Sequence, residues 1–211
     1  MLGLVIATGV DRCNTRRKEA ATLQDYYTAI RADLEQESRS NQLNIGDAEN
    51  DVASLDNAVH LLASSHTDSL VRGIEEVTNV MAKGVFRTFS PTTFDVMVNT
   101  DDISLIEDLE LRSDLAAVFA FRTNIIEQDL HDYNDRVLQT LDGLAAGVDL
   151  RCILNLTVTA ACIRSTAALT ASNIDALLIL QLVAHSRLFH LRMGQEQVVE
   201  MIERMDTLIT R

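Results

Sequence analysis

The scarcity of proline most constrains the fold of this chain, whose 211 residues contain one proline and only eight glycines. An all-β sandwich or barrel needs turn residues every 8–12 positions, so the composition argues against both architectures. Proline and glycine are also the residues that most strongly oppose helix formation, and their rarity favours long helices. Apolar residues make up 47% of the chain, which is enough to build a core and excludes disorder as its main state.

The spacing of apolar residues is helical along most of the chain. In the first run, the positions i, i+4, i+7 and i+11 are apolar, which defines one face of a helix. These positions are Leu23, Tyr27, Ile30 and Leu34. We therefore predict an all-α fold, a helical bundle of about four long helices with short inserted helices, with more than roughly 65% helix and no sheet. The buried core is predicted to include Tyr27, Leu34, Ile106, Leu115, Leu130 and Ile202.

Glycines and capping residues predict where the helices begin and end. No glycine or proline interrupts residues 10–45, so one long first helix is expected there. Gly46 is predicted to break it, and Asp47 to cap a second helix that reaches Leu62. The later helices are predicted to run from Thr67 or Asp68 to Gly84, from Ser90 to Asn99, from Thr100 to Asp102 as far as Gly143 with Gly147, and from Ser172 or Asn173 to Arg211.

Residues 148–170 contain many β-branched side chains, but a lone strand there would have no partner, so a helix is favoured. Cys152 and Cys162 lie ten residues apart in this segment. On one helix they would be separated by ~15 Å, which is beyond the reach of a disulfide. The chain has no C-x-x-C pair, and its three cysteines, with Cys13, are predicted to be small buried hydrophobic residues.

Charge is distributed unevenly along the chain. The whole chain carries a formal charge of −13, yet its first 18 residues hold four basic residues and one acid. Residues 1–10 are uncharged and mostly apolar, but ten helical residues span only about half of a membrane's hydrocarbon core. We predict that residues 1–18 are the end of a membrane anchor or a basic juxtamembrane segment, and that residues 19–211 form a single helical-bundle domain. The alternative is an amphipathic N-terminus that packs on its own bundle.

Three segments together resemble a bacterial family of membrane-anchored helical proteins of unknown function. They are the arginine-rich run over 10–37, the segment TTFDVMVNTDDISLIEDLELRSDLAAVFAF at 92–121 and the closing run at 173–209. The middle motif of the family is matched by Thr93, Phe94, Ile103, Ile106, Leu111 and Arg112. The chain departs from the family pattern at Asp101 or Asp102, where the family has glycine, and at Cys13, where it has tryptophan. The resemblance implies a helical fold and a membrane tether, and it transfers no catalytic residue.

One cluster of polar side chains suggests metal chemistry. Glu127, His131 and Asp135 lie at i, i+4 and i+8 with Asp132 beside them, and carboxylate and imidazole one turn apart can share a metal ion. A di-metal bundle site also needs Glu-x-x-His motifs, and the chain contains none. We therefore interpret the cluster as a solvated helix face, with a metal-dependent enzyme that uses the His131 cluster as the alternative.

The other histidines and the motif arginine are interpreted as structural. His185 and His190 are five residues apart, too far around a helix to converge on one ligand, and His60 and His66 have no acidic partner at a useful spacing. Arg112 is predicted to form a helix-packing ion pair with an acidic neighbour such as Asp108 or Glu107. Nucleophile-elbow and phosphate-loop motifs are also absent from the sequence.

The expected function follows from these observations. The chain is predicted to be a membrane-tethered helical module, not an enzyme, which serves in interaction, scaffolding or sensing; no catalytic, cofactor or metal residue is assigned. Its expected partners are a lipid membrane, through the N-terminal segment, and a protein or a second copy of the chain; its acidity excludes nucleic acid. The expected location is the bacterial inner membrane. The side that holds the bundle is left open, although the basic cluster over 12–18 favours the cytoplasm.

Overall fold

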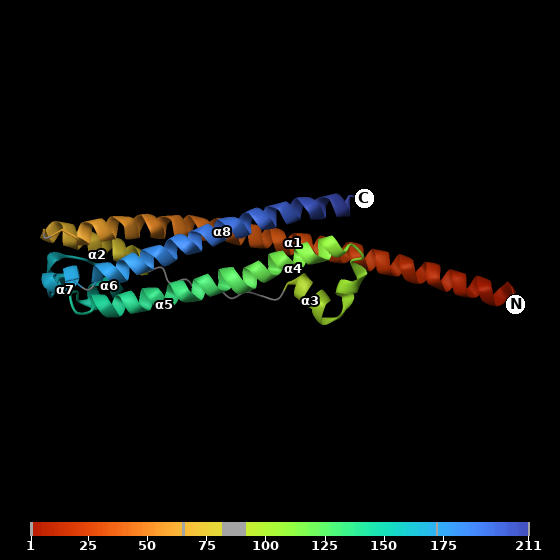
Figure 1. Cartoon of the computed structure of the whole chain (residues 1–211), viewed down its shortest axis with the longest axis horizontal. Coiled ribbons are helices and arrows are strands. Elements are labelled where there is room, and N and C mark those ends of the chain that lie inside the picture. Colours follow the sequence, from red (N-terminus) through yellow and green to blue (C-terminus); the bar gives the residue numbers. More distant parts are fainter. Residues whose placement is uncertain (1, 65, 82–91, 172, 211) are drawn as a thin grey trace. The chain divides into compact units, whose positions relative to one another are not determined.

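The computed structural model describes residues 2–64, 66–81, 92–171 and 173–210. It is all-α and 87% helical, with no strand among those residues, which confirms the predicted fold class (Figure 1). The helices are α1 (Leu2–Leu62), α2 (Thr67–Met81), α3 (Thr93–Asn99), α4 (Leu109–Phe121), α5 (Glu127–Leu144), α6 (Leu150–Leu154), α7 (Thr166–Ala171) and α8 (Asn173–Ile209). Two 3₁₀ turns, η1 (Asp102–Leu105) and η3 (Ala160–Cys162), and a π-helical turn, η2 (Arg122–Ile126), lie between them. The predicted boundaries at Gly84, Ser90 and Ser172 lie outside the described residues.

The chain divides into two compact units. The first comprises residues 1–40, 89–121 and 194–211, and the second comprises residues 41–88 and 122–193. Both α1 and α8 therefore contribute residues to each unit. The predicted division into an N-terminal segment and one bundle domain stays a prediction.

The first unit packs around a hydrophobic core built from α1, α3, α4 and the end of α8. Its buried members are Tyr27, Ile30, Leu34, Phe94, Met97, Ile106, Leu111, Leu115, Phe119, Val198, Met201 and Met205. Four of the six predicted core residues are among them. Ile202 is half-buried against this core, and Leu130, in the second unit, is also only half-buried, so the prediction of full burial was wrong for both.

The short helix α3 begins with a capping box. Thr92 is its N-cap: the Thr92 hydroxyl accepts from the Asp95 N–H, and Asp95 accepts in return from the Thr92 N–H at 2.7 Å. The Thr93 N–H donates to Asp33 of α1 at 2.6 Å, which ties α3 to the first helix. The N-cap of this helix is therefore Thr92, and the prediction that Ser90 caps it was wrong, whereas the predicted end at Asn99 is confirmed.

Asp101 has a positive φ of 64°, a backbone conformation that favours glycine and that aspartate tolerates better than most residues. The adjacent Asp102 accepts a hydrogen bond from the Tyr26 hydroxyl at 2.5 Å, which fixes the turn against α1. Asp101 is therefore the left-handed position of this turn.

The first helix does not end at Gly46, and the predicted break there was wrong. α1 continues to Leu62, and a Cβ added at Gly46 would meet nothing within 4 Å. A single glycine inside a helix costs only about 1 kcal/mol. Burial of Ala48, Val52 and Leu55 on the following turns outweighs that cost, because each removes apolar surface from water.

The segment over 148–170, predicted as one helix, consists instead of α6, η3 and α7. Asp149 caps α6, and the helix ends after little more than one turn because Leu156 has a φ of 54°. The Thr157 N–H donates to the Cys152 carbonyl at 3.0 Å, the bond that closes a Schellman C-cap. The chain therefore turns back at this point, which the periodicity of the sequence did not predict.

The turn brings the two cysteines of this segment together. Cys152 and Cys162 form a disulfide, with Cα atoms 6.1 Å apart. The prediction that both are unpaired hydrophobic residues was wrong, since it assumed a single helix. Val148 and Ile163 form an isolated antiparallel bridge next to the disulfide. The side chain of Cys13 lies outside the described part of the chain.

One helical stretch of the described chain, Thr166–Ile209, is apolar and long enough to span a membrane by those two criteria alone. Only 29% of its most apolar window is buried. Within the second unit, α8 buries one face and exposes another, and the exposed large apolar residues are Leu178, Ile179, Leu182 and Phe189. The N-terminal part of α1 is not such a stretch.

Candidate functional site

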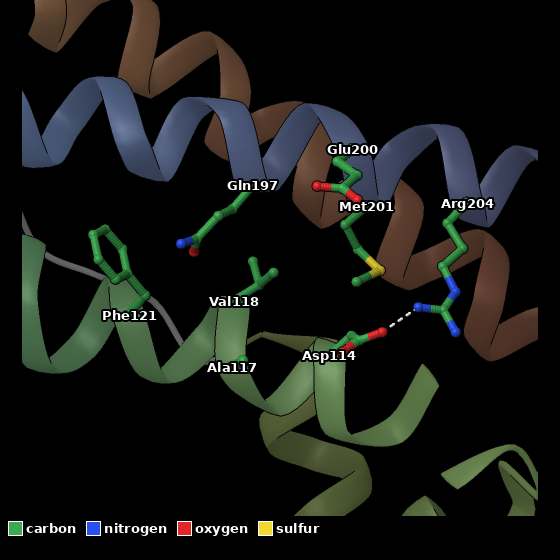
Figure 2. A pocket seen from close by; sticks show the side chains of 8 residues that line it. All are labelled: Asp114, Ala117, Val118, Phe121, Gln197, Glu200, Met201 and Arg204. Atoms are coloured by element: carbon green, nitrogen blue, oxygen red, sulfur yellow. Dashed lines mark hydrogen bonds and ion pairs between the residues drawn. The ribbon is translucent and has the colours of Figure 1, made fainter. Parts of the chain in front are cut away.

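A pocket of about 370 Å³ lies in the first unit, between α4 and the C-terminal part of α8 (Figure 2). Four residues of each helix line it, and in both helices they lie at i, i+3, i+4 and i+7, which is one helix face. The two helices run antiparallel here, so Phe121 and Gln197 lie at one end and Asp114 and Arg204 at the other. The lining residues are Asp114, Ala117, Val118 and Phe121 of α4, and Gln197, Glu200, Met201 and Arg204 of α8.

The apolar part of the pocket continues the core of the unit. Met201 is a buried core residue, and Val118 packs against the same core. Ala117 and the ring of Phe121 extend this apolar surface along α4. The apolar wall of the pocket is therefore supported by the packed core of the unit.

The polar groups of the pocket are unequally paired. Arg204 forms an ion pair with Asp114, shown as the dashed line in Figure 2, and its second terminal nitrogen lies 3.9 Å from Asp108. In the part of the chain that the structure describes, neither Glu200 nor Gln197 makes a side-chain hydrogen bond or ion pair. One guanidinium thus faces two carboxylates, and a third carboxylate, that of Glu200, lines the pocket unpaired. The local charge is negative.

The second unit contains a closed polar centre. The Tyr133 hydroxyl donates to Asp51 at 2.9 Å, and Arg187 lies 3.4 Å from the same carboxylate oxygen. All three residues are buried. Burial, and next the Asp51 charge, raise the pKa of Tyr133 well above its ordinary value, so the phenol stays protonated and keeps donating. With three helices joined and no solvent access, this centre is structural.

Two asparagines on α1 extend the polar face of this helix. Asn41 and Asn44 are buried, 1% and 5% exposed, one turn apart. Both polar atoms of the Asn41 side chain and the Asn44 Oδ1 lack a hydrogen-bond partner among the described residues. Buried polar residues of this kind in packed helices favour one register over others at a cost in stability.

The residues proposed for metal chemistry do not converge. His131 and Asp135 lie 3.6 Å apart, but their side chains are 70% and 54% exposed. Gln128 bonds Asp132 at 2.8 Å on the same exposed face. Within the described ranges, no group of three histidine, cysteine, aspartate or glutamate side chains is arranged to hold a metal ion. His131, Asp132 and Asp135 lie on the exposed face of α5, and Glu127 is half-buried.

The other histidines are separate from one another. His190 lies 2.6 Å from Asp129, both half-buried, and His185 lies 3.7 Å from Asp56 at the surface. His60 and His66 are exposed. Each of the paired histidines contacts one acid of a neighbouring helix, which is a packing role.

The predicted ion pair of Arg112 does not form. Arg112 makes no side-chain hydrogen bond or ion pair with any residue that the structure describes, and Arg204 takes the Asp108 carboxylate instead. Asp108 also caps α4, because its carboxylate accepts the Glu110 N–H at 3.0 Å. The sequence suggested the correct acid but the wrong arginine, because the partner lies about ninety residues further along the chain.

The pocket was not predicted from the sequence. Its two faces are separated by about eighty residues, and neither has a recognisable motif. The available signal was the pairing of two helical faces that each carry charged and apolar residues at i, i+3, i+4 and i+7. Comparisons with known protein families, with curated proteins and with solved structures found no match for this chain.

Proposed function

We propose that this chain is a non-catalytic helical module that residues 1–18 tether to the bacterial inner membrane, and that it acts in interaction, scaffolding or sensing. One observation carries the proposal: α1 runs without a break from Leu2 to Leu62. The same helix therefore joins the apolar and basic N-terminal residues to the packed core that begins near Tyr27. A continuous helix transmits displacement or rotation between a membrane and a bundle, whereas a flexible linker does not.

The exposed charge at the start of α1 supports this role. Arg16, Arg17 and Lys18 are exposed and belong to the only basic cluster at an end of an otherwise acidic chain. Each basic residue near an anionic membrane surface contributes about 1 kcal/mol of attraction. The acidic remainder is repelled from such a surface, so the N-terminal segment is the part suited to hold it there.

The disulfide favours an oxidising compartment for the bundle. Glutathione and thioredoxin keep thiols reduced in the cytosol, so disulfides form and persist mainly in other compartments. The Cys152–Cys162 bridge therefore favours the periplasmic side. The basic cluster over 12–18 alone favours the cytoplasmic side, but the disulfide outweighs it because it is a covalent property of the folded bundle.

The tether is tested by co-sedimentation with anionic liposomes at low salt. The full chain should sediment with the vesicles, and a variant without residues 1–18 should stay in the supernatant with unchanged helicity. Replacement of Arg16, Arg17 and Lys18 by glutamine should weaken sedimentation, whereas the same replacement of the exposed Arg39, Arg72 and Arg136 should not. A full chain that stays in the supernatant contradicts the tether.

The compartment is tested by thiol counting in cells that express the chain. Alkylation before reduction should modify one thiol per chain, that of Cys13, and alkylation after reduction should modify three. Three modified thiols before reduction would place the bundle on the reducing side, and the tether would then have the opposite orientation.

A further inference from the structure

The pocket between α4 and α8 has the size and the mixed lining of a small-molecule site. Its volume of about 370 Å³ lies within the range of ligand pockets, near the lower end. Figure 2 shows that its length is bounded by the Phe121 ring and by the Asp114–Arg204 ion pair. A ligand in this space meets apolar side chains of both helices, and it also meets the Gln197 amide and the Glu200 carboxylate of α8.

The charges of the pocket favour a cation. The Arg204 guanidinium is already occupied by Asp114 and lies close to Asp108, so it is not available to an incoming anion. The exposed Glu200 carboxylate, by contrast, has no partner in the described chain, and the Gln197 amide oxygen is an additional acceptor about one turn earlier on α8. Unpaired acceptors next to apolar surface recognise a donor group that carries an apolar substituent.

We propose that this pocket binds a small organic ammonium ion with a short aromatic or branched apolar group. The ammonium group pairs with Glu200 and donates to Gln197, and the apolar group packs on Val118, Met201 and the ring of Phe121. An ammonium ion fits better than a neutral molecule of the same shape because it compensates the negative charge of the pocket. The inference goes beyond the proposed tether and holds whether or not residues 1–18 bind a membrane.

The experiment uses the full chain in nanodiscs of zwitterionic phosphatidylcholine, with empty nanodiscs as the reference. The probe is 2-phenylethylammonium, titrated by ligand-observed NMR. The comparators are 2-phenylethanol, which has the same shape without the charge, and 3-phenylpropionate, which has the opposite charge. The ammonium should bind more tightly than either comparator.

Three substitutions locate the binding. Glu200→Gln should raise the dissociation constant of the ammonium about threefold to fivefold, the effect expected for an exposed ion pair. Glu203→Gln removes the same charge from an exposed position of α8 outside the pocket, and it should leave the constant unchanged. Ala117→Leu adds volume within the pocket and should weaken both the ammonium and the alcohol.

The proposal is overturned by any of three results. Equal dissociation constants in the Glu200→Gln and Glu203→Gln variants would exclude the carboxylate contact. Binding of 3-phenylpropionate as tight as that of the ammonium would exclude selection for a cation. Undiminished binding in Ala117→Leu would put the ligand outside the pocket.

Discussion

The guanidinium carbon of Arg187 lies 4.7 Å from the centroid of the Tyr133 ring, and the guanidinium also pairs with Asp51, which accepts the Tyr133 hydroxyl. The three residues come from α8, α5 and α1, so one polar centre joins three helices of the second unit. Arg187 and Asp51 are both almost fully buried. A buried ion pair of this kind does not by itself raise stability over an apolar core, but the loss of one partner leaves the other charge uncompensated.

Replacement of Arg187 should therefore destabilise the protein strongly. Arg187→Ala leaves the buried Asp51 carboxylate without its cation and removes the contact with the Tyr133 ring. We expect a loss of about 3–5 kcal/mol in the free energy of unfolding, measured by urea denaturation. The matched control is Arg192→Ala, at a second arginine of α8. It breaks the exposed pair with Glu49 of α1 and should cost about 1 kcal/mol or less. Similar losses in the two variants would contradict the assignment of a buried structural centre.

Two leucines separate the effect of full burial from that of partial burial. Leu115 is 0% exposed in the core of the first unit, whereas Leu130 is half-buried. Leu115→Ala should cost about 2–5 kcal/mol, since it removes apolar contacts and leaves a cavity. Leu130→Ala should cost less than about 2 kcal/mol, because the site is open to water and no closed cavity forms. Denaturant midpoints of both variants give the comparison, and equal shifts would count against the difference in burial.

Helix periodicity predicted the fold class because burial of one face is what stabilises these helices, and the sequence records that face directly. Leu34 and Leu115 were identified this way. The same method failed at Gly46, where a local helix-breaking preference is weaker than the burial that continues on both sides. It also failed at 148–170, where the chain reverses at the left-handed Leu156 and the disulfide joins the two arms. Such tertiary constraints leave no periodic pattern of apolar residues in the sequence.

The candidate site was less accessible to sequence analysis than the fold. A pocket between helices needs the pairing and the register of two distant faces, and periodicity gives only the face of each helix. The buried charges did carry a signal: Asp51 and Arg187 occur among apolar positions that repeat at helical spacing. That pattern suggests a buried pair, but it does not say which acid meets which base, as Arg112 and Arg204 illustrate.

The stability of the disulfide-closed segment should depend on pH through Asp149. Hydrogen bonds from the Arg151 side chain and backbone, and then from Arg164, hold the pKa of Asp149 well below its ordinary value of 3.8. A carboxyl whose pKa is lower in the folded state stabilises that state above about pH 4, and the contribution is lost as the pH falls toward the folded-state pKa. The urea midpoint of the parent should therefore fall between pH 5 and pH 3.

Asp149→Asn isolates this contribution, because asparagine can still cap α6 but does not titrate. Its urea midpoint should fall less than that of the parent over the same pH interval. Arg151→Gln removes the arginine side chain that is the principal donor to Asp149, and the urea midpoint of this variant should also fall less than that of the parent. Parallel losses in all three proteins would mean that other carboxyl groups control the acid sensitivity.

Two glycines test whether α1 is continuous. Gly46 lies inside the helix with room for a Cβ, so Gly46→Ala should stabilise the protein by about 0.5–1 kcal/mol, as alanine does in place of glycine in a helix interior. Gly73 is the matched control on α2: a Cβ there would lie 2.7 Å from Leu62 Cγ, and Gly73→Ala should destabilise by about 1–3 kcal/mol because the two helices must separate. Urea denaturation of both variants measures the sign of each change in the free energy of unfolding.

If the chain turned at Gly46, as its sequence suggested, alanine would be strained in the left-handed conformation of a helix C-cap and Gly46→Ala would also destabilise. Opposite signs for the two substitutions are therefore the result expected of one uninterrupted helix from Leu2 to Leu62.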